Sequence, residues 1–118
     1  RIRGYMGTKA SPVGQITLNV KLGSTTIIQH TPTPATSQGN TKNFWVYADI
    51  TCRTTGATGT VMGQAEFRYP TNFLTDGETA TDTIDTTASQ AVDVTVTWAT
   101  ADVSNTITGT NATVEVLN

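Results

Sequence analysis

The chain has 118 residues, of which 36% are hydrophobic and 14% charged, and its formal net charge is −2. This length suits a single domain, residues 1–118, with one core. Seven basic residues without a basic cluster offer little to a phosphate backbone, which excludes nucleic-acid binding. No apolar run reaches about 18 residues, so no membrane insertion is predicted. Because the chain opens on Arg-Ile-Arg, we expect it to be the C-terminal part of a longer polypeptide.

The first part of the chain predicts a strand followed by a hairpin. Residues Ile2 to Tyr5 already have strand character, and apolar and polar residues alternate from Ile16 to Leu22, which predicts a strand with one buried face. Gly23-Ser24 is a turn, after which Thr25 to His30 returns as a second strand. Two prolines then predict a long loop over Thr31–Asn43.

The middle of the chain predicts the strongest hairpin. Phe44–Arg53 is the longest strand candidate, Thr54–Gly59 turns the chain, and Thr60–Tyr69 returns. The buried face of the first strand is predicted to carry Phe44, Val46, Ala48, Ile50 and Cys52. The buried face of the second is predicted to carry Val61, Gly63, Ala65, Phe67 and Tyr69.

The last part of the chain predicts shorter elements. Asn72–Glu78 is expected to be a loop whose Phe73 and Leu74 close one end of the core. A weak strand is expected over Thr81–Thr86. A strong strand follows over Ala91–Trp98, with its inward side chains being Val92, Val94, Val96 and Trp98. Ala99–Ser104 is predicted to be a connection, and a closing pair is predicted from Asn105–Thr108 and Ala112–Leu117 around Gly109-Thr110-Asn111.

Helical periodicity is absent, and the strands are short and separated by turns. The sequence therefore predicts an all-β fold, a jelly-roll or related antiparallel β-sandwich of about eight strands.

The longest strand candidate carries the most informative residues. Trp45 and Tyr47 are out of phase with its apolar face, so one face is aliphatic and the other aromatic. One interpretation is that both faces are buried, the aromatic one beneath a loop or a neighbouring subunit. The other is an exposed aromatic platform that stacks on a sugar ring, with Asp49 and Arg53 bonding its hydroxyls. In both cases these four residues form the predicted binding or subunit-contact face.

No catalytic, cofactor or metal site is predicted. One histidine and one cysteine cannot form a structural zinc site. A calcium site at Asp76, Glu78 and Asp82 lacks the spacing of a known calcium loop, so these are interpreted as solvated turn residues. A Ser-His-Asp triad through His30 lacks a nucleophile elbow. Cys52 is interpreted as a small buried side chain.

Three segments resemble the jelly-roll domains of bacteriophage virion proteins. They are GQITLNVKLG at 14–23, TTGATG at 54–59 and VDVTVTWATADVSNTI at 92–107, and they follow one another in the right order. Such domains cap head fibres, tail fibres or capsid spikes, or decorate capsids. The resemblance implies a homotrimer, contacts with other virion proteins, and a role in virion structure or in attachment to a host-surface glycan. It carries over no catalytic residue.

The expected function is therefore that of a virion structural domain located on the extracellular particle, and no enzyme activity is expected. The alternative is a carbohydrate-binding module of a secreted enzyme or adhesin. The two longest polar loops, Thr31–Asn43 and Asn72–Thr81, are predicted to contribute a variable contact surface. The small net charge predicts weak salt dependence of binding.

Overall fold

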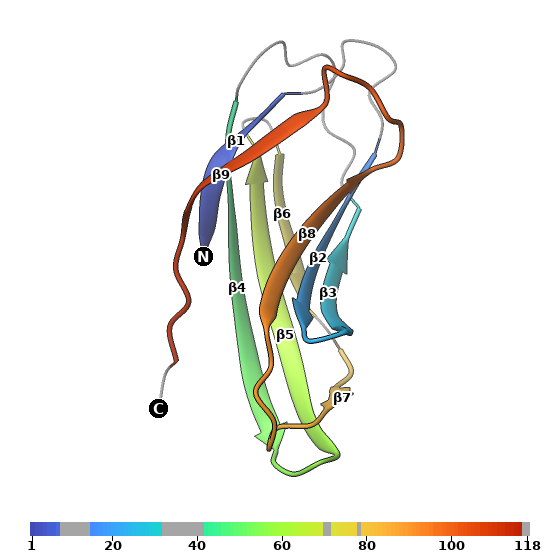
Figure 1. The fold of residues 1–118 in the computed structure, drawn as a ribbon, viewed down its shortest axis with the longest axis vertical. Coiled ribbons are helices and arrows are strands. Elements are labelled where there is room, and N and C mark those ends of the chain that lie inside the picture. The colour runs from blue at the N-terminus through green and yellow to red at the C-terminus, as the bar shows by residue number, and fades with distance from the viewer. Residues whose placement is uncertain (8–14, 32–41, 70–71, 78, 117–118) are drawn as a thin grey trace.

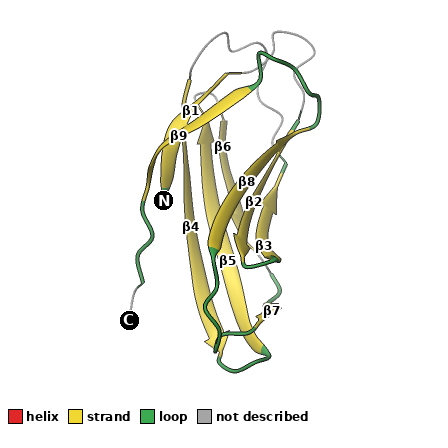
Figure 2. Cartoon of the chain, in the orientation of Figure 1, coloured by secondary structure: helices red, strands yellow, loops and turns green. Residues whose placement is uncertain are grey.

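The computed structural model describes residues 1–7, 15–31, 42–69, 72–77 and 79–116. Within these ranges the chain forms strands and no helix (Figures 1 and 2). The strands are β1 (Ile2–Gly7), β2 (Ile16–Leu22), β3 (Thr25–His30), β4 (Lys42–Thr54), β5 (Gly59–Tyr69), β6 (Asn72–Gly77), β7 (Asp82–Ile84), β8 (Val92–Trp98) and β9 (Thr106–Ala112). The all-β prediction is confirmed.

Two antiparallel sheets form the sandwich. The larger has the order β6-β5-β4-β1-β9, and β7 pairs with β5 beyond the end of β6. The smaller has the order β3-β2-β8. The first and last strands pair in one sheet while β2 and β8 pair in the other, which is the nesting of a jelly roll. The inner strands form simple hairpins instead, so the fold is a related sandwich.

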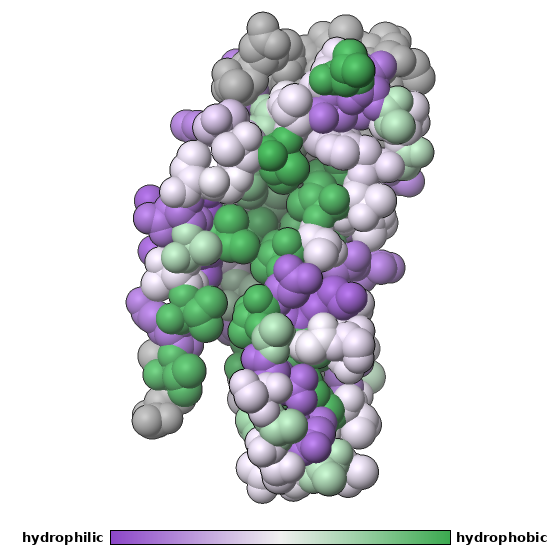
Figure 3. All heavy atoms as spheres, viewed as in Figure 1, coloured by the Kyte–Doolittle hydropathy of each residue, from purple (hydrophilic) through white to green (hydrophobic). Residues whose placement is uncertain are grey.

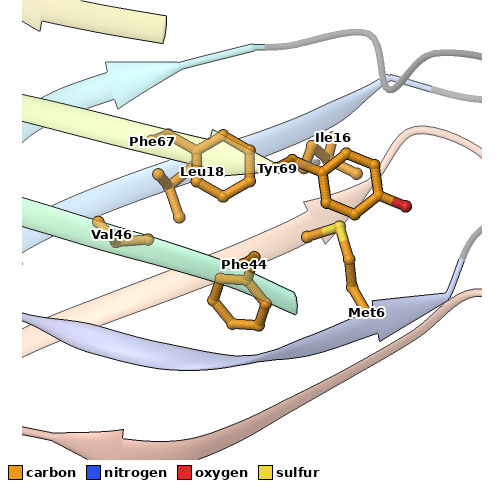
Figure 4. Packing of buried hydrophobic residues seen from close by; sticks show 7 residues of the cluster. All are labelled: Met6, Ile16, Leu18, Phe44, Val46, Phe67 and Tyr69. Atoms are coloured by element: carbon orange, nitrogen blue, oxygen red, sulfur yellow. The ribbon is translucent and has the colours of Figure 1, made fainter. Parts of the chain in front are cut away.

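The core lies between the two sheets. Near one end it is built from a cluster whose side chains come from both layers (Figure 4): Met6, Ile16, Leu18, Phe44, Val46, Phe67 and Tyr69. Toward the other end a second cluster contains Val20, Ile27, Ile28, Val61 and Ile84. Most of these residues are those that the alternating pattern predicted to face inward, because the period of two is a local property of a strand.

A bulge explains why two successive residues of β3 are buried. Val20 pairs with Ile28 and Lys21 with Thr26, so Ile27 has no partner on β2. Both isoleucines are almost fully buried. The extra residue turns both side chains toward the core.

Two predicted connections are strands. Asn72–Gly77, expected to be a loop, is β6 and pairs with β5 from Tyr69 to Gln64. Its Asn, Asp and Gly residues have low strand propensity, and pairing with a neighbouring edge overrides that preference. The side chains of Phe73 and Leu74 lie outside the described part of the structure, as does most of the loop predicted over Thr31–Asn43, of which Lys42 and Asn43 belong to β4.

The predicted closing hairpin is also wrong, because β9 runs straight through Gly109-Thr110-Asn111. Gly4 pairs with Gly109 and Arg3 with Asn111, so Thr110 is an extra residue in a bulge. The residues Gly109-Thr110-Asn111, which are typical of turns, therefore form a β-bulge here and do not reverse the chain. The segment after Ala112 forms no described strand, and Val114 and Val116 on it are exposed.

Two residues predicted to be buried are exposed. Cys52 shares the inward face of β4 with Val46, but it lies where β4 extends beyond its neighbour β1. Val92 begins β8 and is 48% exposed. Both were assigned by alternation, which identifies a face but cannot show whether another layer covers it.

Candidate functional site

The outer face of the larger sheet carries the predicted contact residues. Because opposite residues of paired strands share a face, the registers place Arg3, Trp45 and Arg68 in one row across β1, β4 and β5. Tyr47 lies opposite Glu66 in the next row. We call this surface the arginine–aromatic face and define it by Arg1, Arg3, Tyr5, Trp45, Tyr47, Glu66, Arg68 and Asp49.

Trp45 is held between charged neighbours. Its indole is 39% exposed, and the Arg68 guanidinium lies 5.5 Å from the ring centroid. Arg68 also forms an ion pair with Glu66 on the same strand. A guanidinium over an aromatic ring is attracted by the ring quadrupole. The Trp45 ring is therefore partly covered by a side chain that a ligand could displace.

Tyr47 has a similar arrangement with different partners. It is also 39% exposed, and the Arg1 guanidinium lies 5.6 Å from its ring centroid. Its hydroxyl hydrogen-bonds to Asp49, and this bond, together with the negative charge of Asp49, raises the pKa of Tyr47. Arg1 lowers that pKa by a smaller amount and Glu115 raises it. The Tyr47 phenol therefore ionises at a higher pH than an ordinary tyrosine.

The structure brings together three of the four predicted site residues. Trp45, Tyr47 and Asp49 are successive outward residues of β4, whereas Arg53 lies four residues beyond Asp49, about 13 Å along the strand. Sequence reasoning missed the contributions of Arg1, Arg3, Tyr5 and Arg68. Their outward alternation was visible in the sequence, but the pairing of β1 with β4 was not.

The face is open in the described part of the chain. None of the described elements packs over Trp45 and Tyr47, which excludes burial beneath one of those elements. Burial by a neighbouring subunit and stacking on a sugar ring both remain predictions.

The other candidate residues are not gathered into a site. His30 ends β3 and is half-buried. No group of three or more His, Cys, Asp or Glu side chains that could hold a metal occurs among the described residues. Glu78 and the side chain of Asp76, two of the three considered for calcium, lie outside that set.

A second feature is an apolar groove of about 480 Å³ between the two sheets. It opens between β9 and β8, and Figure 3 shows apolar residues gathered in the hollow. Its lining is Ile2, Leu18, Phe44, Val46, Val94, Val96, Ile107, Gly109, Thr110, Asn111 and Ala112.

Comparison with known protein families, with curated proteins and with solved structures finds no match to this chain. Among the described residues no helix is long and apolar enough to cross a membrane.

Proposed function

We propose that this chain is a structural domain of a virus particle that self-associates and contacts a host surface, and that the arginine–aromatic face is its contact surface. The observation that carries the proposal is the open row of Arg3, Trp45 and Arg68, with Tyr47 beside it. Tryptophan, tyrosine and arginine are the residue types that most often dominate binding energy at protein interfaces. The resemblance of three sequence segments to phage jelly-roll domains supplies the virion context.

The composition of the face favours recognition by shape and hydrogen bonding. Two aromatic rings supply rigid apolar surface, and the arginines, Asp49 and Glu66 supply donors and acceptors around them. Burying such a ring contributes on the order of 2–3 kcal/mol. A face of this kind suits a protein partner or a glycan.

The second candidate is a carbohydrate-binding module. The exposure of Trp45 and Tyr47 favours it, because a sugar ring stacks on an aromatic face while neighbouring polar groups bond its hydroxyls. The virion proposal includes glycan attachment, so the two differ mainly in whether the domain assembles with itself and with other particle proteins.

The test replaces Trp45 and Tyr47 by alanine together and measures both oligomer mass and ligand binding. Binding to host-cell glycans or to a panel of acidic and neutral polysaccharides should fall at least about 100-fold, since each of the two rings contributes about 1.4 kcal/mol or more. Because both side chains are only 39% exposed and each packs under an arginine, the free energy of unfolding should fall by about 1–2 kcal/mol, which leaves the fold to be checked by circular dichroism.

The matched control is Lys21→Ala on the smaller sheet, which removes a cation away from the face. Tryptophan fluorescence is read in a Trp98→Phe background, so that Trp45 alone reports ligand contact. Unchanged binding and unchanged mass in the Trp45 and Tyr47 double variant would refute the proposal. A monomer that binds polysaccharide through Trp45 would favour the carbohydrate-binding module.

A further inference from the structure

The charged groups of the arginine–aromatic face differ in whether they already have a partner within it. The Glu66 carboxylate forms an ion pair with the Arg68 guanidinium. The Asp49 carboxylate accepts the hydrogen bond of the Tyr47 hydroxyl. Both carboxylates of the face are therefore engaged by neighbouring donors, so a ligand finds its open charged group among the arginines.

Arg3 is the arginine of this face that has no partner of its own. It is exposed, and its guanidinium forms no ion pair, hydrogen bond or ring contact with another residue in the described part of the chain. Arg68 is paired with Glu66, and the Arg1 guanidinium lies over the Tyr47 ring. The face has one more guanidinium than carboxylate groups, and the Arg3 guanidinium is the one that is available to an anion.

Strand register places Arg3 directly beside Trp45. The two residues are partners across β1 and β4, so their Cβ atoms lie about 5 Å apart on the same face of the sheet. Arg68 is the partner of Trp45 across β4 and β5. β4 lies between β1 and β5 (Figure 1). The indole therefore has a paired arginine on one side and an unpaired arginine on the other.

Uncharged polar groups continue the face along the strands. Asn43 precedes Trp45 by two residues on β4 and is the partner of Tyr5 on β1, and both are exposed. Tyr47 follows Trp45 by two residues, about 7 Å along the strand. Amide and phenol groups thus lie on either side of Trp45 along the sheet, where they can form hydrogen bonds with the hydroxyl groups of a ligand.

The surroundings of Trp45 favour a saccharide over a protein as the ligand. None of the described outward residues around it on β1, β4 and β5 is aliphatic, and they are Arg3, Tyr5, Asn43, Tyr47, Glu66 and Arg68. The buried core of a protein–protein interface is instead depleted of charged groups. A sugar ring stacks on an aromatic side chain while polar neighbours bond its hydroxyls, which is the arrangement that this face offers.

We propose that the arginine–aromatic face binds a sugar that carries a carboxylate, with the sugar ring on Trp45 and the carboxylate on the Arg3 guanidinium. The proposal rests on the contact face proposed above and names its ligand class, a uronic or sialic acid unit of a glycan. A guanidinium presents a planar fork of N–H donors that matches the two oxygens of a carboxylate. Because Arg3 and Trp45 are cross-strand partners, one sugar unit can make both contacts.

The remaining charges limit how much negative charge the ligand can carry. A second anionic group placed farther along β4 would meet the carboxylates of Glu66 and Asp49, which already have partners. The face therefore suits a glycan with isolated carboxylates better than a densely charged polyanion. The bound sugar ring also covers one side of the ion pair with Arg3, so salt screens that pair less than a fully exposed one.

The first experiment tests the carboxylate by titration calorimetry. Sialyllactose and a hyaluronan tetrasaccharide are each compared with their carboxyl methyl esters, which keep the sugar rings and remove the charge. The wild-type chain should bind at least one of the two acids about tenfold or more tightly than its ester, because a bidentate ion pair is lost in the ester. Failure to bind either acid, or equal binding of acid and ester, would overturn the proposal.

The second experiment tests the cation. Arg3→Gln should lower the affinity for the acid about tenfold or more and change the affinity for the ester by about twofold at most. Arg3→Lys should cause a smaller loss, since it keeps the charge and removes the planar fork. Circular dichroism checks that both variants fold.

Arg53→Gln is the matched control for this change. Arg53 is an exposed arginine of the same strand as Trp45, about 27 Å along it. Its replacement should leave the affinities for acid and ester unchanged within about twofold. An equal loss of acid binding in Arg53→Gln and Arg3→Gln would show a general effect of charge and overturn the assignment to Arg3.

Competition identifies the kind of anion that the face recognises. Dextran sulfate carries sulfate groups on a sugar, and a glutamate-rich peptide carries carboxylates without a sugar. Neither should displace the bound acid as effectively as the free acid does. Effective displacement by the peptide would indicate an acidic protein partner, and effective displacement by dextran sulfate would indicate a polyanion site, so either result would overturn the proposal.

The possible outcomes separate this proposal from the one it rests on. Loss of acid binding in the Trp45 and Tyr47 double variant, together with an acid-selective loss in Arg3→Gln, would support both. Binding that requires Trp45 but is equal for acid and ester would uphold the contact face and overturn the carboxylate assignment. Acid binding that requires Arg3 but survives removal of both rings would overturn both, because neither ring would then contact the sugar.

Discussion

The residues of the arginine–aromatic face are arranged in pairs of one aromatic and one guanidinium. The guanidinium of Arg68, on β5, lies over the Trp45 ring. The guanidinium of Arg1, just before β1, lies over the Tyr47 ring. These pairs are set by cross-strand register rather than by neighbours in sequence. Each exposed ring is therefore oriented before any partner arrives, which reduces the entropy lost on binding.

The Tyr47 hydroxyl provides a prediction at this scale. Asp49→Asn should lower the pKa of Tyr47 toward its ordinary value, because the neutral amide is a weaker acceptor for the hydroxyl hydrogen bond and removes the negative charge that opposes ionisation. Since the folded-state pKa is raised, the contribution of the phenol to stability is present below its ordinary pKa near 10. It is lost as the pH rises through the raised value.

Absorbance of tyrosinate during an alkaline titration measures this shift. Tyr47→Phe identifies which of the three titrations belongs to Tyr47. An unchanged Tyr47 titration in Asp49→Asn would show that the Asp49 carboxylate does not raise the pKa of Tyr47.

At the scale of elements, the close approach of the two sheets depends on one glycine. Gly63 on β5 faces β3, and a Cβ atom there would lie 2.7 Å from side-chain carbons of both Ile27 and Ile28. The bulge in β3 places both isoleucines against this position. The missing side chain at Gly63 therefore leaves room for the two large side chains of β3.

Gly63→Ala should lower the free energy of unfolding by about 1–3 kcal/mol, because the methyl group overpacks a filled core. Gly77→Ala is the matched control on β6, where the nearest atom to a Cβ is Gln64 Cγ at 3.8 Å. Its effect should stay within about 0.5 kcal/mol. Urea denaturation of the two variants and the wild type measures both values. Equal effects would show that the sheets can separate to admit the methyl group.

At the scale of the whole molecule, charges of both signs share the arginine–aromatic face, and the net charge of the chain is only −2. Arg1, Arg3 and Arg68 lie there with Asp49 and Glu66, and Arg68 forms an ion pair with Glu66. The carboxylates therefore offset most of the arginine charge, and the face produces only a small net field.

Attachment through the arginine–aromatic face should therefore change little as salt is raised, although salt screens charges over about 10 Å at 0.1 M. Binding of an acidic and of a neutral polysaccharide at low and high salt measures the response. A strong loss of binding at high salt that is confined to the acidic polysaccharide would contradict this prediction.

The sequence by itself determined the strands that alternate most clearly and the direction of their side chains. Alternation from Ile16 to Leu22 and from Phe44 to Tyr69 predicted β2, β4 and β5, because side-chain direction in a strand depends only on adjacent residues. It also identified Trp45 and Tyr47 as outward residues.

Only the tertiary structure decided which strands pair and which edges remain open. The position of β1 between β4 and β9 brings Arg1 and Arg3 to the aromatic residues and leaves Cys52 uncovered. Pairing made a strand of Asn72–Gly77 and a bulge of the predicted turn at Thr110. Register joins residues more than one hundred positions apart, and no local pattern contains that information.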